Sequence, residues 1–119
     1  MSAAPTAADV LGLHPKIRWA GLASENGEVI WMQQRAGITS FSPEDTDRAF
    51  VQMGPLIVSG VCERLSPWTG QVGSIVINYE KVTSLITRLT AGFLCMTIEK
   101  EGAQDSVREI TKSLERWSR

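Results

Sequence analysis

The fold of this 119-residue chain is indicated most clearly by residues 17–31, which read IRWAGLASENGEVIW. The dipeptide Asn26-Gly27 tolerates the positive φ angles that tight hairpin turns demand. Apolar residues alternate along both flanks of this dipeptide, a pattern that is typical of half-buried strands. The stretch therefore predicts a β-hairpin. Because both of its sides are largely apolar, we expect the sheet to be covered on each face near its centre.

A long helix is predicted after the hairpin. Residues 42–45 (Ser-Pro-Glu-Asp) are typical of a helix start, with serine as the cap, proline at the first helical position and acids near the positive end of the dipole. We expect this helix to run to about Leu65. Gly54-Pro55 lies inside it and predicts a kink or a break, because proline removes a hydrogen bond and crowds the preceding turn.

Three further strands and two terminal helices complete the expected element order. β-branched residues dominate three runs separated by short polar turns, which predicts a meander over residues 72–78, 82–89 and 93–100. Thr6 predicts the cap of a short helix through about Leu13. A last helix is predicted by the spacing Val107, Ile110, Leu114, Trp117. We expect residues 1–15 to form a tail with the short helix and residues 16–119 to form one domain of the α+β class.

Composition excludes several classes of protein. No apolar run approaches the roughly 20 residues of a membrane span, so we expect no membrane insertion. The formal charge is −1 and basic residues are scattered among acidic ones, so we expect no nucleic-acid partner. The first residues lack the charged and apolar regions of a secretory signal, which makes the cytoplasm the expected compartment.

The residues that carry enzyme chemistry are sparse. The only histidine is His14, and Cys62 and Cys95 lie in apolar surroundings where thiols behave as small hydrophobes. No metal-ligand spacing and no phosphate-binding loop is present. We therefore expect a protein that is not an enzyme and needs no cofactor. A weaker alternative is an enzyme that uses Cys62 or Cys95, which requires a lowered thiol pKa.

The apolar arc of the long helix is wider than packing on one sheet requires. On a helical wheel the apolar side chains of residues 49–65 spread over about 260°. We expect one side to face the sheet, through Met53, Ile57 and Val61. A second apolar side would then be formed by Val51, Val58, Cys62 and Leu65. The alternatives are coverage of that side by the short helices or by another subunit, and we favour self-association.

With these elements, the chain resembles the Roadblock / dynein light-chain family, and more closely its archaeal and bacterial members within the profilin-like and longin-like group. The resemblance covers residues 16–117. It is carried by the turn at residues 25–30 (ENGEVI), the long apolar helix from Pro43, the glycine-led start of the third strand at residues 70–72 (GQV), and the hairpin at residues 89–96 (LTAGFLCM).

The resemblance implies a five-stranded antiparallel sheet, with the long helix between strands two and three on one face and the terminal helices on the other. It implies a homodimer in which the long helices and the third strands meet across a two-fold axis, so that Val72, Ser74 and Val76 join the interface. It also implies a regulator or scaffold of small Ras-like GTPases, or a subunit of an assembly, without catalytic residues.

Two kinds of binding follow as hypotheses. In a protein-interaction domain, large side chains flanked by charges would contact the partner, and the candidates are Arg18, Trp31 and Arg88. The alternative is a small-molecule sensor of the PAS type, in which Trp19, Trp31 and Met96 would line a pocket between helix and sheet. Trp68 is the tryptophan for which no core position is predicted.

Overall fold

A single five-stranded sheet, with strand order β2-β1-β5-β4-β3, organises the computed structural model. The structure describes residues 4–118, so residues 1–3 of the predicted tail and residue 119 lie outside the described residues. Every neighbouring pair of strands is antiparallel. The strands are β1 (Ile17–Ala23), β2 (Val29–Gln34), β3 (Ser74–Asn78), β4 (Val82–Leu89) and β5 (Gly92–Glu99). The predicted α+β class with a five-stranded antiparallel sheet is confirmed.

The opening hairpin forms where the sequence predicts it. Gly27 has φ of +85° and donates its N–H to the carbonyl of Ser24, at 2.9 Å. Ser24 in turn donates its backbone N–H to the carbonyl of Glu28, at 2.8 Å. Asn26 does not have a positive φ, since within the described residues only glycines do. The left-handed conformation therefore falls on glycine alone, where the absence of Cβ removes its steric cost.

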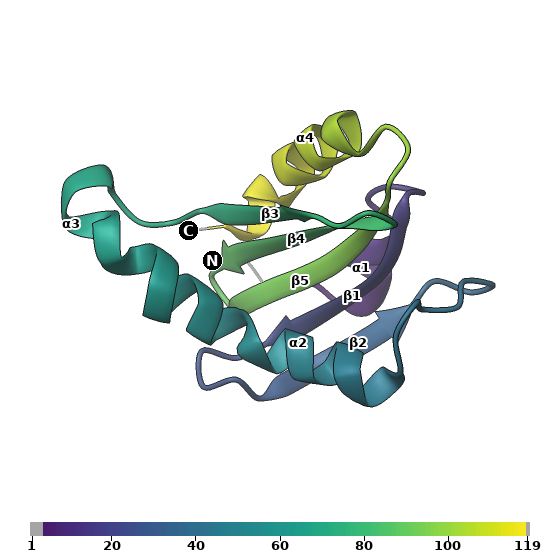
Figure 1. Ribbon diagram of the computed structural model, residues 1–119, viewed down its shortest axis with the longest axis horizontal. Coiled ribbons are helices and arrows are strands. Elements are labelled where there is room, and N and C mark those ends of the chain that lie inside the picture. Colours follow the sequence, from purple (N-terminus) through teal and green to yellow (C-terminus); the bar gives the residue numbers. More distant parts are fainter. Residues whose placement is uncertain (1–3, 119) are drawn as a thin grey trace.

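The long helix continues through four consecutive segments. They are α2 (Glu44–Leu56), the π-helix η1 (Ile57–Val61), the 3-10 helix η2 (Cys62–Leu65) and α3 (Ser66–Thr69). Figure 1 shows them as one helical run in front of the sheet. The run does not break at Pro55; instead the turn widens directly after α2, the kind of adjustment that accommodates an interrupted hydrogen-bond ladder.

The start of α2 differs from the prediction. Pro43 occupies the cap position, and no side chain caps the helix. The expected cap, Ser42, donates its hydroxyl instead to Oδ1 of Asp47, one turn into α2. Acids still fill the first turn of the helix, where they interact favourably with its dipole.

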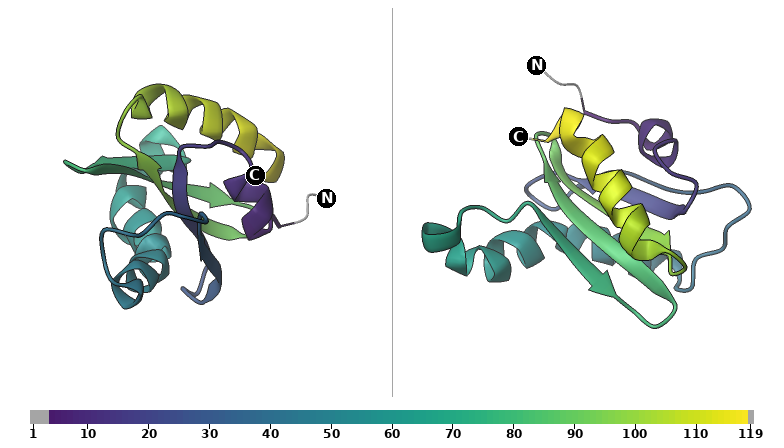
Figure 2. Two further views of the ribbon diagram at one scale, coloured as in Figure 1. Left: turned by 90° about the vertical axis from the view of Figure 1, so that its right-hand side faces the viewer. Right: turned by 90° about the horizontal axis from the view of Figure 1, so that it is seen from above.

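Helices cover both faces of the sheet (Figure 2). On one face lie α1 (Ala7–Leu11), α4 (Ala103–Ser113) and the 3-10 helix η3 (Leu114–Trp117). Thr6 and Asp9 form a reciprocal capping box at α1, which confirms the predicted cap, although α1 ends at Leu11. The core on this face includes Val10, Leu22, Leu85, Met96 and Ile110.

The opposite face is covered by α2 and η1. Its core consists of Trp19, Ala23, Val51, Val58, Ile86, Phe93 and Cys95. Helix and sheet approach closely here, because a Cβ on Gly21 would lie 2.6 Å from Cγ2 of Val51 and a Cβ on Gly54 would lie 3.2 Å from Sγ of Cys95.

The predicted assignment of helix faces is therefore wrong. Val51 and Val58, expected on the second apolar side, are buried against the sheet. Met53 and Val61, expected to face the sheet, are exposed, and only Ile57 packs partly against the core. The glycines at positions 21 and 54 set the rotation of α2, since they let its backbone approach the strands on that side.

Candidate functional site

The helical run carries five large apolar side chains that are exposed. Trp68 is 80% exposed and Leu65 is 63% exposed. We call this set of side chains the helical ridge, and its members are Met53, Leu56, Val61, Leu65 and Trp68. Several large apolar side chains exposed on one element make that element a candidate interaction site.

Strand β3 presents a free edge beside the end of this ridge. Within residues 4–118 it pairs only with β4. Glu63 in η2 accepts a hydrogen bond from the N–H of Val72 at 3.3 Å, which holds the helical run against the start of β3. On β3 itself, Ser74 and Val76 are exposed. An unpaired edge strand is a template for pairing with another chain.

The residues predicted for a dimer interface divide into two groups. Leu65, Ser74 and Val76 are exposed on the ridge and the β3 edge. Val51 and Val58 are buried in the single chain, whereas Cys62 and Val72 are half-buried. Sequence reasoning missed the ridge positions Met53, Leu56 and Val61. The signal that could have found them is Gly54-Pro55, because small or ring-closed residues suit the side of a helix that packs closely on a sheet.

Arg18, a predicted partner contact, has internal partners. Only 10% of its side chain is exposed, and its Nη1 donates to Oε1 of Glu99 at 2.8 Å. Its Nη2 donates to the carbonyl of Thr39 at 2.9 Å, and its guanidinium lies 4.5 Å from the ring centroid of Phe41. The exposed group at this point of the surface is therefore the Phe41 ring rather than the arginine.

Arg88 and Trp31 also have internal partners. Arg88 forms an ion pair with Glu63 and lies 5.3 Å from the ring centroid of Phe93. Trp31 is half-buried and donates its Nε1–H to the carbonyl of Pro5 at 3.1 Å. A partner contact through Arg18, Trp31 or Arg88 stays a prediction, and it would have to use the small part of each side chain that these contacts leave open.

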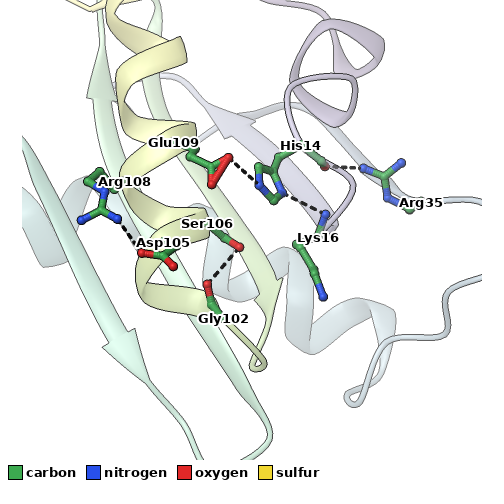
Figure 3. A network of polar contacts seen from close by, with 8 residues as sticks. All are labelled: His14, Lys16, Arg35, Gly102, Asp105, Ser106, Arg108 and Glu109. Carbon is green, nitrogen blue, oxygen red and sulfur yellow. Dashed lines mark hydrogen bonds and ion pairs between the residues drawn. The ribbon is translucent and has the colours of Figure 1, made fainter.

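The single histidine takes part in a structural network (Figure 3). Nε2 of His14 lies 3.3 Å from Oε2 of Glu109 on α4, and Nδ1 accepts the backbone N–H of Lys16 at 3.2 Å. Arg35 donates to the carbonyl of His14 at 2.8 Å. These contacts join the segment between α1 and β1 to α4.

The thiol of Cys95 lacks activating surroundings among the described residues. Burial raises the pKa of the Cys95 thiol from its ordinary value of 9.0 to about 12, the opposite of what a nucleophile requires. Both cysteines are free, and Cys62 is half-buried. Among residues 4–118, no group of three or more His, Cys, Asp or Glu side chains could hold a metal ion. No helix in this range has both the length and the apolar character that crossing a bilayer demands.

The predicted sensor pocket does not form from the residues named for it. Met96 and Trp31 pack on the α1/α4 face of the sheet, and Trp19 is in the core under α2. The sheet separates them, because alternate residues of a strand point to opposite faces.

Known structures share this arrangement of elements. The Roadblock/LC7 domain from Streptomyces avermitilis has a TM-score of 0.63 at 15% identity, over 88% of this chain and 88% of that one. The gliding protein MglB from Thermus thermophilus has a TM-score of 0.64 at 14% identity, over 92% of this chain and 83% of that one. A structure of MglB in a tetrameric arrangement has a TM-score of 0.63 at 14% identity, over 92% and 82%. No protein-family model and no curated protein matches the sequence.

Proposed function

We propose that this chain is a non-enzymatic protein-interaction domain that works as a homodimer. The proposal is supported by its Roadblock/LC7 fold and by an exposed helical ridge that ends beside a free strand edge. The single observation that carries the proposal is the position of the ridge. Its exposed apolar side chains end in η2 and α3, next to the start of β3. Both features call for a covering partner, and the α3 end of the helical run leads directly into the segment before β3 (Figure 1).

A second copy of the chain is the partner that fits both features. Two β3 strands related by a two-fold axis run antiparallel, so their free edges can pair and extend the sheet across both copies. The same axis brings the helical ridges of the two copies against each other. Burial of their apolar surface would stabilise the dimer by about 25 cal/mol per Å² of area removed from water. The interface would use Leu65, Ser74 and Val76 directly, with Cys62 and Val72 at its border and Val51 and Val58 supporting it from beneath.

The partner of the dimer is proposed by resemblance. Roadblock-like proteins act on small Ras-like GTPases or as subunits of assemblies, and we propose one of these roles for this chain, in the cytoplasm of an archaeon or bacterium. The free thiols of Cys62 and Cys95 suit a reducing compartment.

Light scattering at micromolar concentration tests the homodimer. The expected mass is twice that of the 13.1 kDa chain. Leu65→Asp should shift the protein to monomer, because the interface would then bury an unpaired carboxylate. Ile30→Asp is the matched control, since Ile30 is 53% exposed on the opposite edge strand β2 and should leave the dimer intact. A wild-type protein that scatters as a monomer would refute the proposal.

The partner is tested with the dimer as bait. Purified dimer should retain a small GTPase from an extract of its own cells, and recombinant GTPase should then bind the dimer but not the Leu65→Asp monomer. If the GTPase bound both forms with equal affinity, partner recognition would not require the dimer. An extract from which no protein is retained would contradict the interaction role.

A further inference from the structure

An open groove of about 470 Å³ lies at the end of the sheet where α2 begins. Its floor is formed by Trp19, Ser84 and Thr97, and aromatic side chains from three separate segments surround it. These are Phe41 before α2, Phe50 in α2 and Tyr79 after β3. Lining residues come from the first turn of α2 and from the β3–β4 turn, two segments that lie on the right in Figure 1. This volume and this aromatic lining are typical of small-molecule sites.

The sheet changes character under the groove. Beneath α2 and η1 its inner face is apolar, with Ile86 paired across the strands with Cys95. Two residues further along, the corresponding cross-strand pair is Ser84 with Thr97, and both are buried. A simple core would continue the apolar pattern. Hydroxyls at these positions suit a ligand that brings polar groups as well as an apolar body.

Two residues that line the groove each carry a buried oxygen without a hydrogen-bond partner. Asp47 is only 4% exposed; its Oδ1 accepts from Ser42, but its Oδ2 has no partner. Oγ1 of Thr97, a residue 8% exposed, has none either. Within residues 4–118 the one other such atom is Nε of Arg88, outside the groove. Buried polar atoms are almost always paired, so two in one groove point to donors supplied from outside.

Two cationic and two acidic side chains line the groove, namely Arg18, Lys81, Asp47 and Glu80. The charge of Arg18 is compensated by Glu99, whose Oε1 lies 2.8 Å from Nη1 of the arginine. Cζ of Arg18 lies 4.5 Å from the ring centroid of Phe41. Lys81 and Glu80 line the groove together with opposite charges, and the Lys81 Nζ lies 5.7 Å from the Phe41 centroid. Asp47 is the lining carboxylate whose Oδ2 has no hydrogen-bond partner, and a positively charged donor would form a charge-assisted bond with it.

We propose that this groove binds a small aromatic or heteroaromatic cation, whose N–H groups donate to Asp47 and Thr97 and whose ring packs among Phe41, Phe50 and Tyr79. Such a ligand satisfies the two orphan acceptors and fills the aromatic lining at once. The inference goes beyond the proposed function, and it does not depend on it, because the groove lies at the start of α2 and the helical ridge runs to α3.

The test uses benzamidine as the probe and benzoate as its match in shape with the opposite charge. Each is titrated into the ¹⁵N-labelled protein and followed by two-dimensional NMR. Benzamidine should cause saturable shifts in the Trp19 indole and in the amides of residues 40–50 and 79–84, with a Kd on the order of 1 mM. Benzoate should bind at least about tenfold more weakly.

Variants assign the binding to the carboxylate and the ring. Asp47→Asn should weaken benzamidine binding at least about tenfold, and Phe41→Ala should weaken it too. Asp45→Asn is the matched control, because Asp45 lies in the same helical turn, is exposed and does not line the groove. The spectrum of each variant away from the groove shows whether it is folded.

Three results would overturn the proposal. They are benzoate binding as tightly as benzamidine, unchanged affinity in a folded Asp47→Asn variant, and the absence of saturable shifts at these residues up to about 10 mM benzamidine. Methylguanidine, which has the cation without the ring, distinguishes the source of the ligand. If it binds as well as benzamidine, the aromatic ligand is refuted and an arginine side chain of a protein partner is indicated. Light scattering of the same samples measures their oligomeric state, so ligand binding in the groove and dimerisation are tested separately.

Discussion

Arg88 on β4 forms an ion pair with Glu63, a residue in η2 beyond the end of α2. Their side chains are only 14% and 17% exposed, and Glu63 also accepts the N–H of Val72 at 3.3 Å. The pair therefore fixes the end of the helical run against the sheet, at the margin where the ridge and the β3 edge meet. The position of the proposed interface depends on it.

Removal of Arg88 should destabilise the fold. Arg88→Ala leaves Glu63 without its cation in a poorly solvated position, so we expect the free energy of unfolding to fall by about 3 kcal/mol. Urea denaturation measures this loss. Arg48→Ala is the control, because its pair with Glu44 spans 3.6 Å on the exposed surface of α2 and should contribute less than about 0.5 kcal/mol. Equal losses for the two variants would contradict a special role for the Arg88 pair.

Gly21 permits the close contact between β1 and α2. In Gly21→Ala the new Cβ would lie 2.6 Å from Cγ2 of Val51, so we expect overpacking to cost about 1 to 3 kcal/mol in thermal or urea unfolding. In a Val51→Ala background the same substitution should cost less, since the clashing methyl groups are gone. Gly73→Ala is a control with nothing within 4 Å of the new Cβ. A Gly21→Ala protein as stable as the wild type would show that α2 can shift freely.

Cys95 should make the protein sensitive to alkali. Its pKa in the folded chain is raised to about 12 by burial, above the ordinary 9.0, so the unfolded chain loses this proton first. Below about pH 9 the thiol is protonated in both states and does not change the free energy of unfolding. Between pH 9 and 12 the free energy of unfolding should fall by about 1.4 kcal/mol per pH unit.

Unfolding of the wild type and of Cys95→Ala at pH 7 and pH 10 isolates this effect. We expect Cys95→Ala to lose about 1 to 2 kcal/mol at pH 7 through the cavity, and to show a smaller further loss at pH 10 than the wild type. The same slope in Cys95→Ala and the wild type would assign the alkaline loss to other groups.

Trp31 should support the packing of the N-terminal segment. Trp31→Phe keeps an aromatic ring but removes the Nε1–H donated to Pro5, so we expect a loss of about 1 kcal/mol and a melting temperature lower by about 4 °C. If Trp31 instead served a partner, the variant would melt like the wild type and would bind that partner less tightly. Calorimetry and a binding assay on the same sample separate these outcomes.

Local patterns in the chain were enough to specify the elements and their order. Residues 82–89 form a strand with the predicted bounds, and Gly27 turns the opening hairpin. Thr6 and Asp9 cap the first helix as expected. Each of these features depends on residues close together in the chain, because turn chemistry, capping and periodicity are local. Once the element order was known, the resemblance to Roadblock-like proteins and the five-stranded sheet followed.

Packing between distant segments settled which side of α2 faces the sheet and which polar groups pair. A helix that is apolar almost all round has no single preferred face, so its rotation was set by the approach of Gly21 to Val51, residues on different elements. The pairs Arg18–Glu99 and Arg88–Glu63 join residues 81 and 25 positions apart. Asp47 and Thr97 line one groove although 50 positions separate them in the sequence. Such contacts form only when the tertiary structure brings the segments together, and local patterns of side chains do not encode them.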